Sequence, residues 1–155
     1  MLLKEKDMKV ISYFRNNART SLTKLSRITK IPVSTIFDKL KEFETTKIIL
    51  KHTALIDFKN IGYAIRSQML ITAPQTTKNK LQEFLVKNPK VNTIFRINNG
   101  YDFLVETIFK TLEELDEFTK ELDHYEIKEK KEFFIMEDIK REEFLTYKEN
   151  IGILK

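Results

Sequence analysis

Apolar residues recur at helical spacing in three successive segments of the first sixty residues. The pattern predicts helices over residues 6–17 and 21–29, and a third helix that begins at Pro32, a residue pre-set for a first helical position. Ser21 is a candidate N-cap of the second helix. The apolar stripe of the third helix consists of Val33, Ile36, Leu40 and Phe43. The last two helices are short and closely joined, which is typical of a helix-turn-helix motif.

Residues 48–57 follow these helices and are rich in β-branched side chains. The segment is too apolar for a loop, so it predicts one or two short strands. Three helices followed by such strands predict a winged helix-turn-helix domain over residues 1–60. We expect Phe37, on the flank of the third helix, to pack against the wing rather than to contact a thymine methyl group.

Strand and helix patterns alternate over the remaining residues, 61–155. The predicted elements are a strand at 64–73, a helix at 76–88, strands at 91–98 and 101–109, a helix at 112–125 and a strand at 127–138. Asn99-Gly100, between the two central strands, is a strong hairpin signal. The order βαββαβ predicts a ferredoxin-like (RAM/ACT-like) domain, an antiparallel sheet with both helices on one face. The fold class is therefore α+β, with two domains.

The predicted sheet has one face without helices. If that face is apolar, its usual cover is the same face of a second copy, so we predict a homodimer formed by residues 61–155. A dimer also suits the first domain, because two helix-turn-helix motifs read half-sites about 34 Å apart. The C-terminal tail, residues 140–155, is apolar enough to dock rather than trail. Its apolar side chains are Tyr147, Ile151, Ile153 and Leu154.

Charge is distributed unevenly between the two predicted domains. The chain has 28 Lys and Arg against 23 Asp and Glu, a net charge of +5. Residues 1–60 carry thirteen basic against six acidic side chains, a net of +7, whereas residues 61–155 carry fifteen against seventeen, a net of −2. Because phosphate neutralisation needs clustered cations, only the first domain is expected to contact a polyanion. The partner we expect is double-stranded DNA.

The third helix carries short polar side chains on the face opposite its apolar stripe, and these suit a major groove. The candidates for contact with base edges are Ser34, Thr35 and Asp38. The candidates for contact with phosphates are Lys24, Arg27, Lys30, Lys39, Lys41 and Lys51. Asp38 repels phosphate, so it favours binding only where it accepts a hydrogen bond from a cytosine amino group.

Composition excludes several other classes of protein. The chain has no cysteine, and 33% of its residues are charged. No run approaches the roughly 18 uncharged residues of a transmembrane helix, and the first residues are too charged for a signal peptide. We therefore expect a cytoplasmic protein without disulfides, metal, cofactor or membrane partner.

Several short motifs follow one another in a fairly specific order along nearly the whole chain. They are Ile31, Ser34-Thr35-Ile36, Leu40-Lys41, Ile48-Ile49, Ile61-Gly62-Tyr63, Pro89-Lys90-Val91 and Asn99-Gly100-Tyr101-Asp102, together with residues 17–21 and 53–57. In this order they resemble the Lrp/AsnC family, the leucine-responsive and asparagine-type transcription regulators of bacteria and archaea.

The resemblance implies DNA binding by the winged helix, dimers that often assemble into octamers, and effector amino acids at dimer-dimer contacts near the Gly-x-Tyr-Asp turn. The effector-site residues it implies are Asn99, Gly100, Tyr101 and Asp102. The chain departs from the family pattern at Lys30, Pro32, Asp38, Glu42, Lys47, Lys51 and His52. Two of these departures, Asp38 and Glu42, replace customary arginines and so subtract positive charge from the recognition helix.

Two other functions compete with regulation. Sirohaem decarboxylases share the overall fold and would need histidines around a tetrapyrrole, but His52 falls in the wing and His124 at the end of the last helix, with no metal or acid/base spacing between them. RNA-recognition modules share the βαββαβ topology and stack bases on aromatics of a basic strand, whereas residues 101–109 contain Asp102 and Glu106. The sequence favours a transcription regulator over both.

Overall fold

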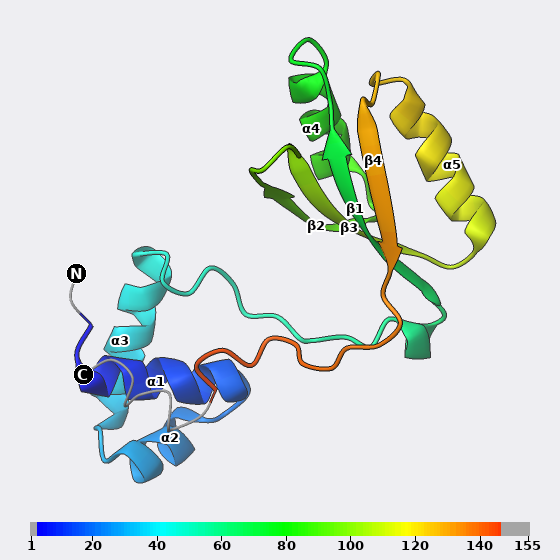
Figure 1. Ribbon diagram of the computed structural model, residues 1–155. Helices are drawn as coiled ribbons and strands as arrows, with labels where there is room; N and C mark the ends of the chain where they lie inside the picture. The colour runs from blue at the N-terminus through cyan, green and yellow to red at the C-terminus, as the bar shows by residue number, and fades with distance from the viewer. Residues whose placement is uncertain (1–2, 147–155) are drawn as a thin grey trace. The chain divides into compact units, whose positions relative to one another are not determined.

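The computed structural model describes residues 3–146 (Figure 1). The chain forms two compact units. Within the described range, the first contains residues 3–55 together with 139–146, and the second contains residues 56–138. The chain therefore passes from the first unit into the second near residue 56 and returns to the first near residue 138.

Three helices build the first unit: α1 (Glu5–Asn16), α2 (Leu22–Thr29) and α3 (Val33–Thr45). The predicted cap of α2 is confirmed, because the Ser21 hydroxyl accepts a hydrogen bond from the Lys24 backbone N–H at 3.2 Å. Pro32 occupies the N-cap position of α3 rather than its first turn. Residues 30–32 alone join α2 to α3, so the predicted short connection is present.

The core of the first unit lies between these three helices. Its buried side chains are Val10, Leu25, Ile31, Ile36 and Phe43. The stripe predicted for α3 is only partly right, because Val33 is 42% exposed. At about 100° per residue Val33 lies roughly 60° from Ile36, at the edge of the buried stripe.

The predicted wing strands are absent, since residues 48–57 contain no strand. Lys47, whose φ is 61°, precedes the segment, and the Ile49 backbone N–H donates to the Phe43 carbonyl of α3 at 3.0 Å. An isolated two-stranded hairpin is marginal in water, and residues 48–57 contain no Asn-Gly or similar tight turn to close one. The segment is therefore largely exposed, with Leu50 80% accessible, although Ile49 is partly buried against the core of the first unit.

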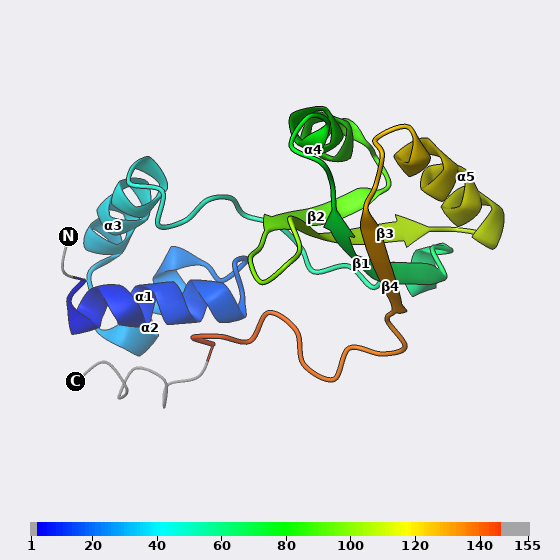
Figure 2. The same ribbon diagram turned by 45° about the horizontal axis from the view of Figure 1, so that its top comes forward.

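The second unit is a four-stranded antiparallel sheet with two helices, as predicted. A short 3-10 turn, η1 (Lys59–Ile61), precedes it, and the strands pair in the order β2-β3-β1-β4. Both helices cover the same face of the sheet (Figure 2). The elements are β1 (Ile65–Thr72), α4 (Lys78–Lys87), β2 (Val91–Arg96), β3 (Phe103–Phe109), α5 (Leu112–Asp123) and β4 (Glu129–Phe134).

Alternation along β1 decides which side chains meet the helices. Met69 and Ile71 are fully buried beneath α4 and α5, and their cross-strand partners are Val105 and Phe103. Within the same layer Ser67 and Thr107 form a buried hydrogen bond of 2.8 Å, which satisfies both hydroxyl groups. The further members of this core are Ala73, Leu81, Leu85, Phe109, Leu115, Phe118 and Leu122.

The strand ends differ from the prediction where side chains bind elsewhere. The hairpin strands were expected to reach residues 98 and 101, but they stop at Arg96 and Phe103. Asp102 lies outside β3, where its carboxylate binds the Ala73 backbone N–H and the Lys78 amine. The last strand ends at Phe134, four residues before its predicted end at Asp138, whose carboxylate instead binds Arg66.

A polar network occupies the helix-free face of the sheet. Arg66 forms an ion pair with Glu106, and its guanidinium contacts both carboxylate oxygens of Asp138 at 2.7 Å. Glu106 is buried and also accepts hydrogen bonds from Asn92 and Thr93. Burial raises the pKa of Glu106, but the hydrogen bonds from Asn92 and Arg66 outweigh it and hold the pKa below its usual value.

We expect acid to destabilise the second unit through Glu106. Because its pKa is lowered on folding, its contribution to stability is complete above the usual glutamate value of 4.5 and is lost as the pH falls through the folded-state pKa. Glu106→Gln is expected to lower the free energy of unfolding by about 2 kcal/mol at neutral pH and to flatten its pH dependence below 4.5. Urea unfolding followed by circular dichroism measures both. An equally steep acid loss in the variant would contradict this role.

Candidate nucleic-acid interface and glycine turn

Five cationic side chains are exposed on the first unit. Lys24 and Arg27 lie on α2, Lys30 is its C-cap with a φ of 60°, Lys41 lies on α3, and Lys51 follows it in the extended segment. None of the five makes an ion pair with another residue between 3 and 146. Because an exposed, uncompensated cation keeps its full attraction for a phosphate, these five side chains form a cationic set available to a polyanion.

Lys39, the sixth phosphate candidate, is partly buried and paired with two carboxylates of the first unit. Its amine lies 3.2 Å from Asp7 Oδ1 and 3.0 Å from Glu42 Oε2, and the hydrogen bonds to Glu42 and Asp7 raise its pKa. Asp7 is itself buried and accepts from the Lys4 backbone N–H. Lys39 thus ties α3 to the start of α1, and this contact gives Glu42 a structural role on a helix where an acid is unexpected.

The base-edge candidates on α3 are all exposed. The side chains of Ser34, Thr35 and Asp38 make no hydrogen bond or ion pair with the residues the structure describes. Phe37 lies beside them and is 48% exposed, with the Lys41 amine 5.0 Å from its ring centroid. The prediction that Phe37 packs against a wing is wrong, because no wing strand forms.

The glycine turn, Asn99-Gly100-Tyr101-Asp102, lies in the connection between β2 and β3. Asn99 and Gly100 have φ values of 64° and 92°, the left-handed conformations that an Asn-Gly turn requires. The turn is fixed to neighbouring strands: Thr72 Oγ1 donates to the Gly100 carbonyl at 2.8 Å, and the Tyr101 hydroxyl donates to Glu129 at 2.7 Å. Asn99 and Gly100 are exposed, whereas Tyr101 is partly covered.

Asp102 is the most firmly held residue of this turn. Its carboxylate lies 2.6 Å from the Lys78 amine and accepts a hydrogen bond from the Ala73 backbone N–H at 3.0 Å. Burial raises the pKa of Asp102, but the Lys78 and Ala73 hydrogen bonds outweigh it and leave the pKa below its usual value. Sequence reasoning missed Lys78, because a lysine in the first turn of a helix gives no signal that it reaches a hairpin 24 positions later.

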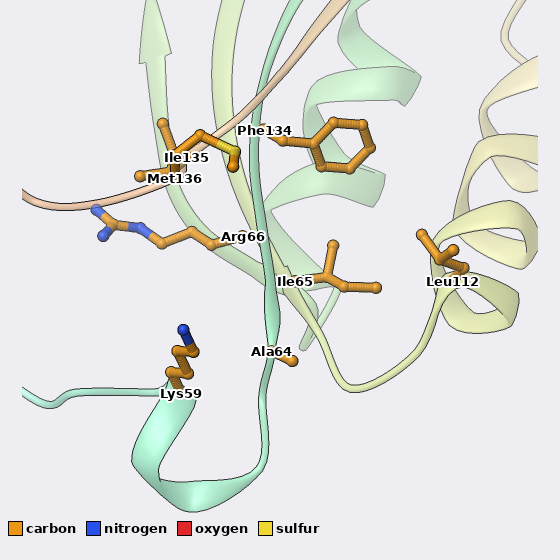
Figure 3. A pocket seen from close by; sticks show the side chains of 8 residues that line it. All are labelled: Lys59, Ala64, Ile65, Arg66, Leu112, Phe134, Ile135 and Met136. Atoms are coloured by element: carbon orange, nitrogen blue, oxygen red, sulfur yellow. The ribbon is translucent and has the colours of Figure 1, made fainter.

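A separate hollow of about 350 Å³ lies where β1 begins and β4 ends (Figure 3). Figure 3 shows Ile65, Phe134 and Leu112 on one side of β1, and Arg66 on the other side with Lys59 below it. None of the predicted site residues lines this hollow. Its Arg66 guanidinium is already paired with Glu106 and Asp138, so the opening is mainly an apolar depression.

The histidines, the acidic side chains and the helix lengths bear on the alternatives of catalysis, metal binding and membrane insertion. His52 lies 3.0 Å from Glu44, and His124 contacts the Glu121 carbonyl at the end of α5, so the two histidines have separate local partners. Among residues 3–146 no three His, Asp or Glu side chains gather as a metal site would need. In the same range no helix has the length and apolar character that crossing a bilayer requires.

Comparison with known proteins places both units among transcription regulators. The model of the Lrp/AsnC ligand binding domain matches residues 69–144. An uncharacterized HTH-type transcriptional regulator of Pyrococcus abyssi is 24% identical over 92% of this chain and 97% of its own length. HTH-type transcriptional regulator FL11 of Pyrococcus horikoshii is 28% identical over 75% of this chain and 77% of its own.

Solved structures show the same fold over nearly the whole chain. A transcriptional regulator of Neisseria meningitidis, determined in complex with L-Met, has a TM-score of 0.83 and 19% identity, and the match covers 90% of this chain and 94% of that one. LrpC of Bacillus subtilis has a TM-score of 0.82 and 18% identity over 90% of this chain and 99% of that one. The likeness therefore extends across both units.

Proposed function

We propose that this chain, which belongs to the Lrp/AsnC family of transcriptional regulators, binds double-stranded DNA through its first unit and assembles through its second. The observation that carries the proposal is the cationic set on the first unit, Lys24, Arg27, Lys30, Lys41 and Lys51. Lys41 lies on α3 itself, and the exposed α3 side chains of Ser34, Thr35 and Asp38 make no hydrogen bond or ion pair with the residues the structure describes. A helix with unpaired polar side chains, on a unit that also carries unpaired cations, matches what a major groove and its phosphates require.

The first unit acts as a helix-turn-helix. In this motif the second helix enters the major groove and the first crosses the phosphate backbone, so α3 reads bases while Lys24 and Arg27 on α2 contact phosphates. Lys39 is a positioning residue in this proposal, because its contacts with Asp7 and Glu42 orient α3 rather than reach DNA. The unit needs no wing strands for this function, and Lys51 supplies a cation from the extended segment instead.

The second unit has the ferredoxin-like topology and offers its helix-free face to a second copy. Across that face Phe95, Leu104 and Leu70 follow one another on β2, β3 and β1, and Phe95 is 56% exposed. Phe133 on β4 adds a further exposed ring. A two-fold partner that covers this row would bury it and place two helix-turn-helix motifs on one duplex. A monomer in sedimentation at micromolar concentration would contradict this assignment.

A small effector is proposed to act at the glycine turn, and its amino-acid class is proposed because a Neisseria meningitidis regulator of this fold was determined in complex with L-Met. The exposed residues Asn99 and Gly100 are the contact candidates. Tyr101 and Asp102 serve to hold the turn, because each already has a partner, Glu129 for the hydroxyl and Lys78 for the carboxylate. Regulation of this kind needs no catalysis, in keeping with the regulator names of the relatives.

Substitutions on α3 are expected to separate affinity from specificity. Lys41→Ala removes a phosphate contact, so it should weaken binding to every duplex by a similar factor of about ten near 0.1 M salt. Ser34→Ala removes a side chain that meets base edges, so it should change the order of preference among duplexes with little change in mean affinity. Fluorescence anisotropy on a panel of duplexes measures both. Equal effects of both variants on every duplex would overturn the assignment of the two roles.

A further inference from the structure

An exposed apolar row runs along α3. Val33 is 42% exposed and Phe37 is 48% exposed. The two residues are four positions apart, so their side chains lie one above the other on the same side of the helix. Lys41 comes one turn later, and its amine lies 5.0 Å from the Phe37 ring centroid. The row therefore consists of two apolar side chains followed by a cation.

This row borders the polar face of α3 that carries Ser34 and Asp38. At about 100° per residue Phe37 lies roughly 60° from Ser34 around the helix axis, so a surface that meets one also meets the other. Phe43, on the same helix, is fully buried in the core. Phe37 lies outside that core, so its exposed ring is available to whatever α3 binds.

The remaining residues of α3 offer little for the commonest way to read a base pair. Guanine is recognised chiefly by bidentate arginine or lysine, but α3 contains no arginine and its Lys39 is held by Asp7 and Glu42. Its Lys41 lies over the Phe37 ring and is assigned to a phosphate. The thymine C5-methyl group is the one apolar group that the major groove presents, and phenylalanine is among the side chains that contact it. An apolar row that ends in the cation Lys41 thus fits thymine in a polyanion better than it fits an apolar protein surface.

We infer that Phe37, together with Val33, contacts thymine methyl groups in the major groove and gives the protein a preference for A·T pairs where α3 lies. The inference rests on the proposed function and names the bases that α3 reads. Lys41 holds the Phe37 ring by a cation-π contact while its charge extends toward the backbone. Ser34 and Thr35 add hydrogen bonds to neighbouring base edges.

The test compares thymine with deoxyuridine, which lacks only the C5-methyl group. A preferred duplex is first selected from a random library with the full chain, and each thymine is then replaced in turn. For the wild type we expect the replacement of a contacted thymine to weaken binding about fourfold. Phe37→Ala is expected to bind the thymine and deoxyuridine duplexes equally at those positions. Val33→Ala is expected to lose discrimination at one position only.

Phe144→Ala provides the matched control, because Phe144 is an exposed ring outside α3 and outside the proposed dimer face, and its loss should leave discrimination unchanged. Equal binding of thymine and deoxyuridine duplexes by the wild type would overturn the inference while DNA binding stands, and this comparison needs no variant. Discrimination that survives in Phe37→Ala would overturn it as well, and a smaller oligomer in that variant would assign Phe37 to a contact between copies. If the wild type binds no DNA at low salt, the proposed function itself fails.

Discussion

Phe43→Ala is expected to unfold the first unit and abolish DNA binding while the second unit remains folded. Phe43 is fully buried between the three helices, and removal of a buried phenylalanine side chain costs about 3–5 kcal/mol. A unit of this size has a stability of only roughly 3–8 kcal/mol, so the loss removes most of it. Thermal unfolding followed by circular dichroism should then show the second unit's transition alone.

Phe37→Ala is the matched control, since it removes the same side chain from a half-exposed position on the same helix. It should cost less than about 1 kcal/mol, and both unfolding transitions should remain. A wild-type melting temperature for the first unit in Phe43→Ala would contradict the core described here. Loss of both transitions in that variant would show that the two units unfold together.

Neutralising four cations of the first unit is expected to weaken DNA binding about a thousandfold near 0.1 M salt. The variant replaces Lys24, Arg27, Lys30 and Lys51 with glutamine. Each phosphate contact contributes about 0.9 to the slope of log affinity against log salt, so four contacts are worth about three to four orders of magnitude at that concentration. The substituted side chains are exposed and unpaired, so the free energy of unfolding should change little.

An equal loss of charge from the second unit is the control for net charge. Lys80, Lys87, Lys120 and Lys128 are exposed there, and their replacement by glutamine lowers the total charge by the same four units. This variant should retain affinity within a few fold, because these side chains lie outside the proposed interface. Fluorescence anisotropy with one labelled duplex compares all three proteins.

Most of the fold could be predicted because its elements bury one face each. Apolar residues at helical spacing, among them Ile36 and Phe43, predict helices that share a core with Leu25. The alternation that buries Met69 and Ile71 predicts a sheet covered on one face. The Ser21 cap is a local contact, three residues from its donor, so sequence alone could show it. Such features depend on neighbours a few positions apart.

The prediction of wing strands was wrong because a strand needs a pairing partner as well as β-branched residues. Residues 48–57 have strand composition, but no described segment pairs with them. The exposed positions of Val33 and Phe37 were also missed, since an apolar residue at the edge of a stripe can face the core or the solvent. Tertiary packing determines which of these residues are buried, and the periodicity of the sequence alone does not.

The candidate site depended in part on pairings between distant residues. Lys39 and Asp7 are 32 positions apart, and Lys78 and Asp102 are 24 apart, so neither ion pair leaves a mark in local sequence. Each pair supports a different proposed role for a candidate: Lys39 is proposed to anchor α3, and Asp102 is proposed to anchor the turn. The roles of Ser34, Thr35 and Asp38 stay predictions.

The salt dependence of DNA affinity tests the central claim most directly, because it counts phosphate contacts and can be compared between units. We predict that neutralising Lys24, Arg27, Lys30 and Lys51 lowers the slope of log affinity against log salt by about 3.6, while the matched variant of the second unit keeps the wild-type slope. Equal slopes for the wild type and the first-unit variant, or a reduced slope in the second-unit variant alone, would contradict the claim that the first unit binds DNA.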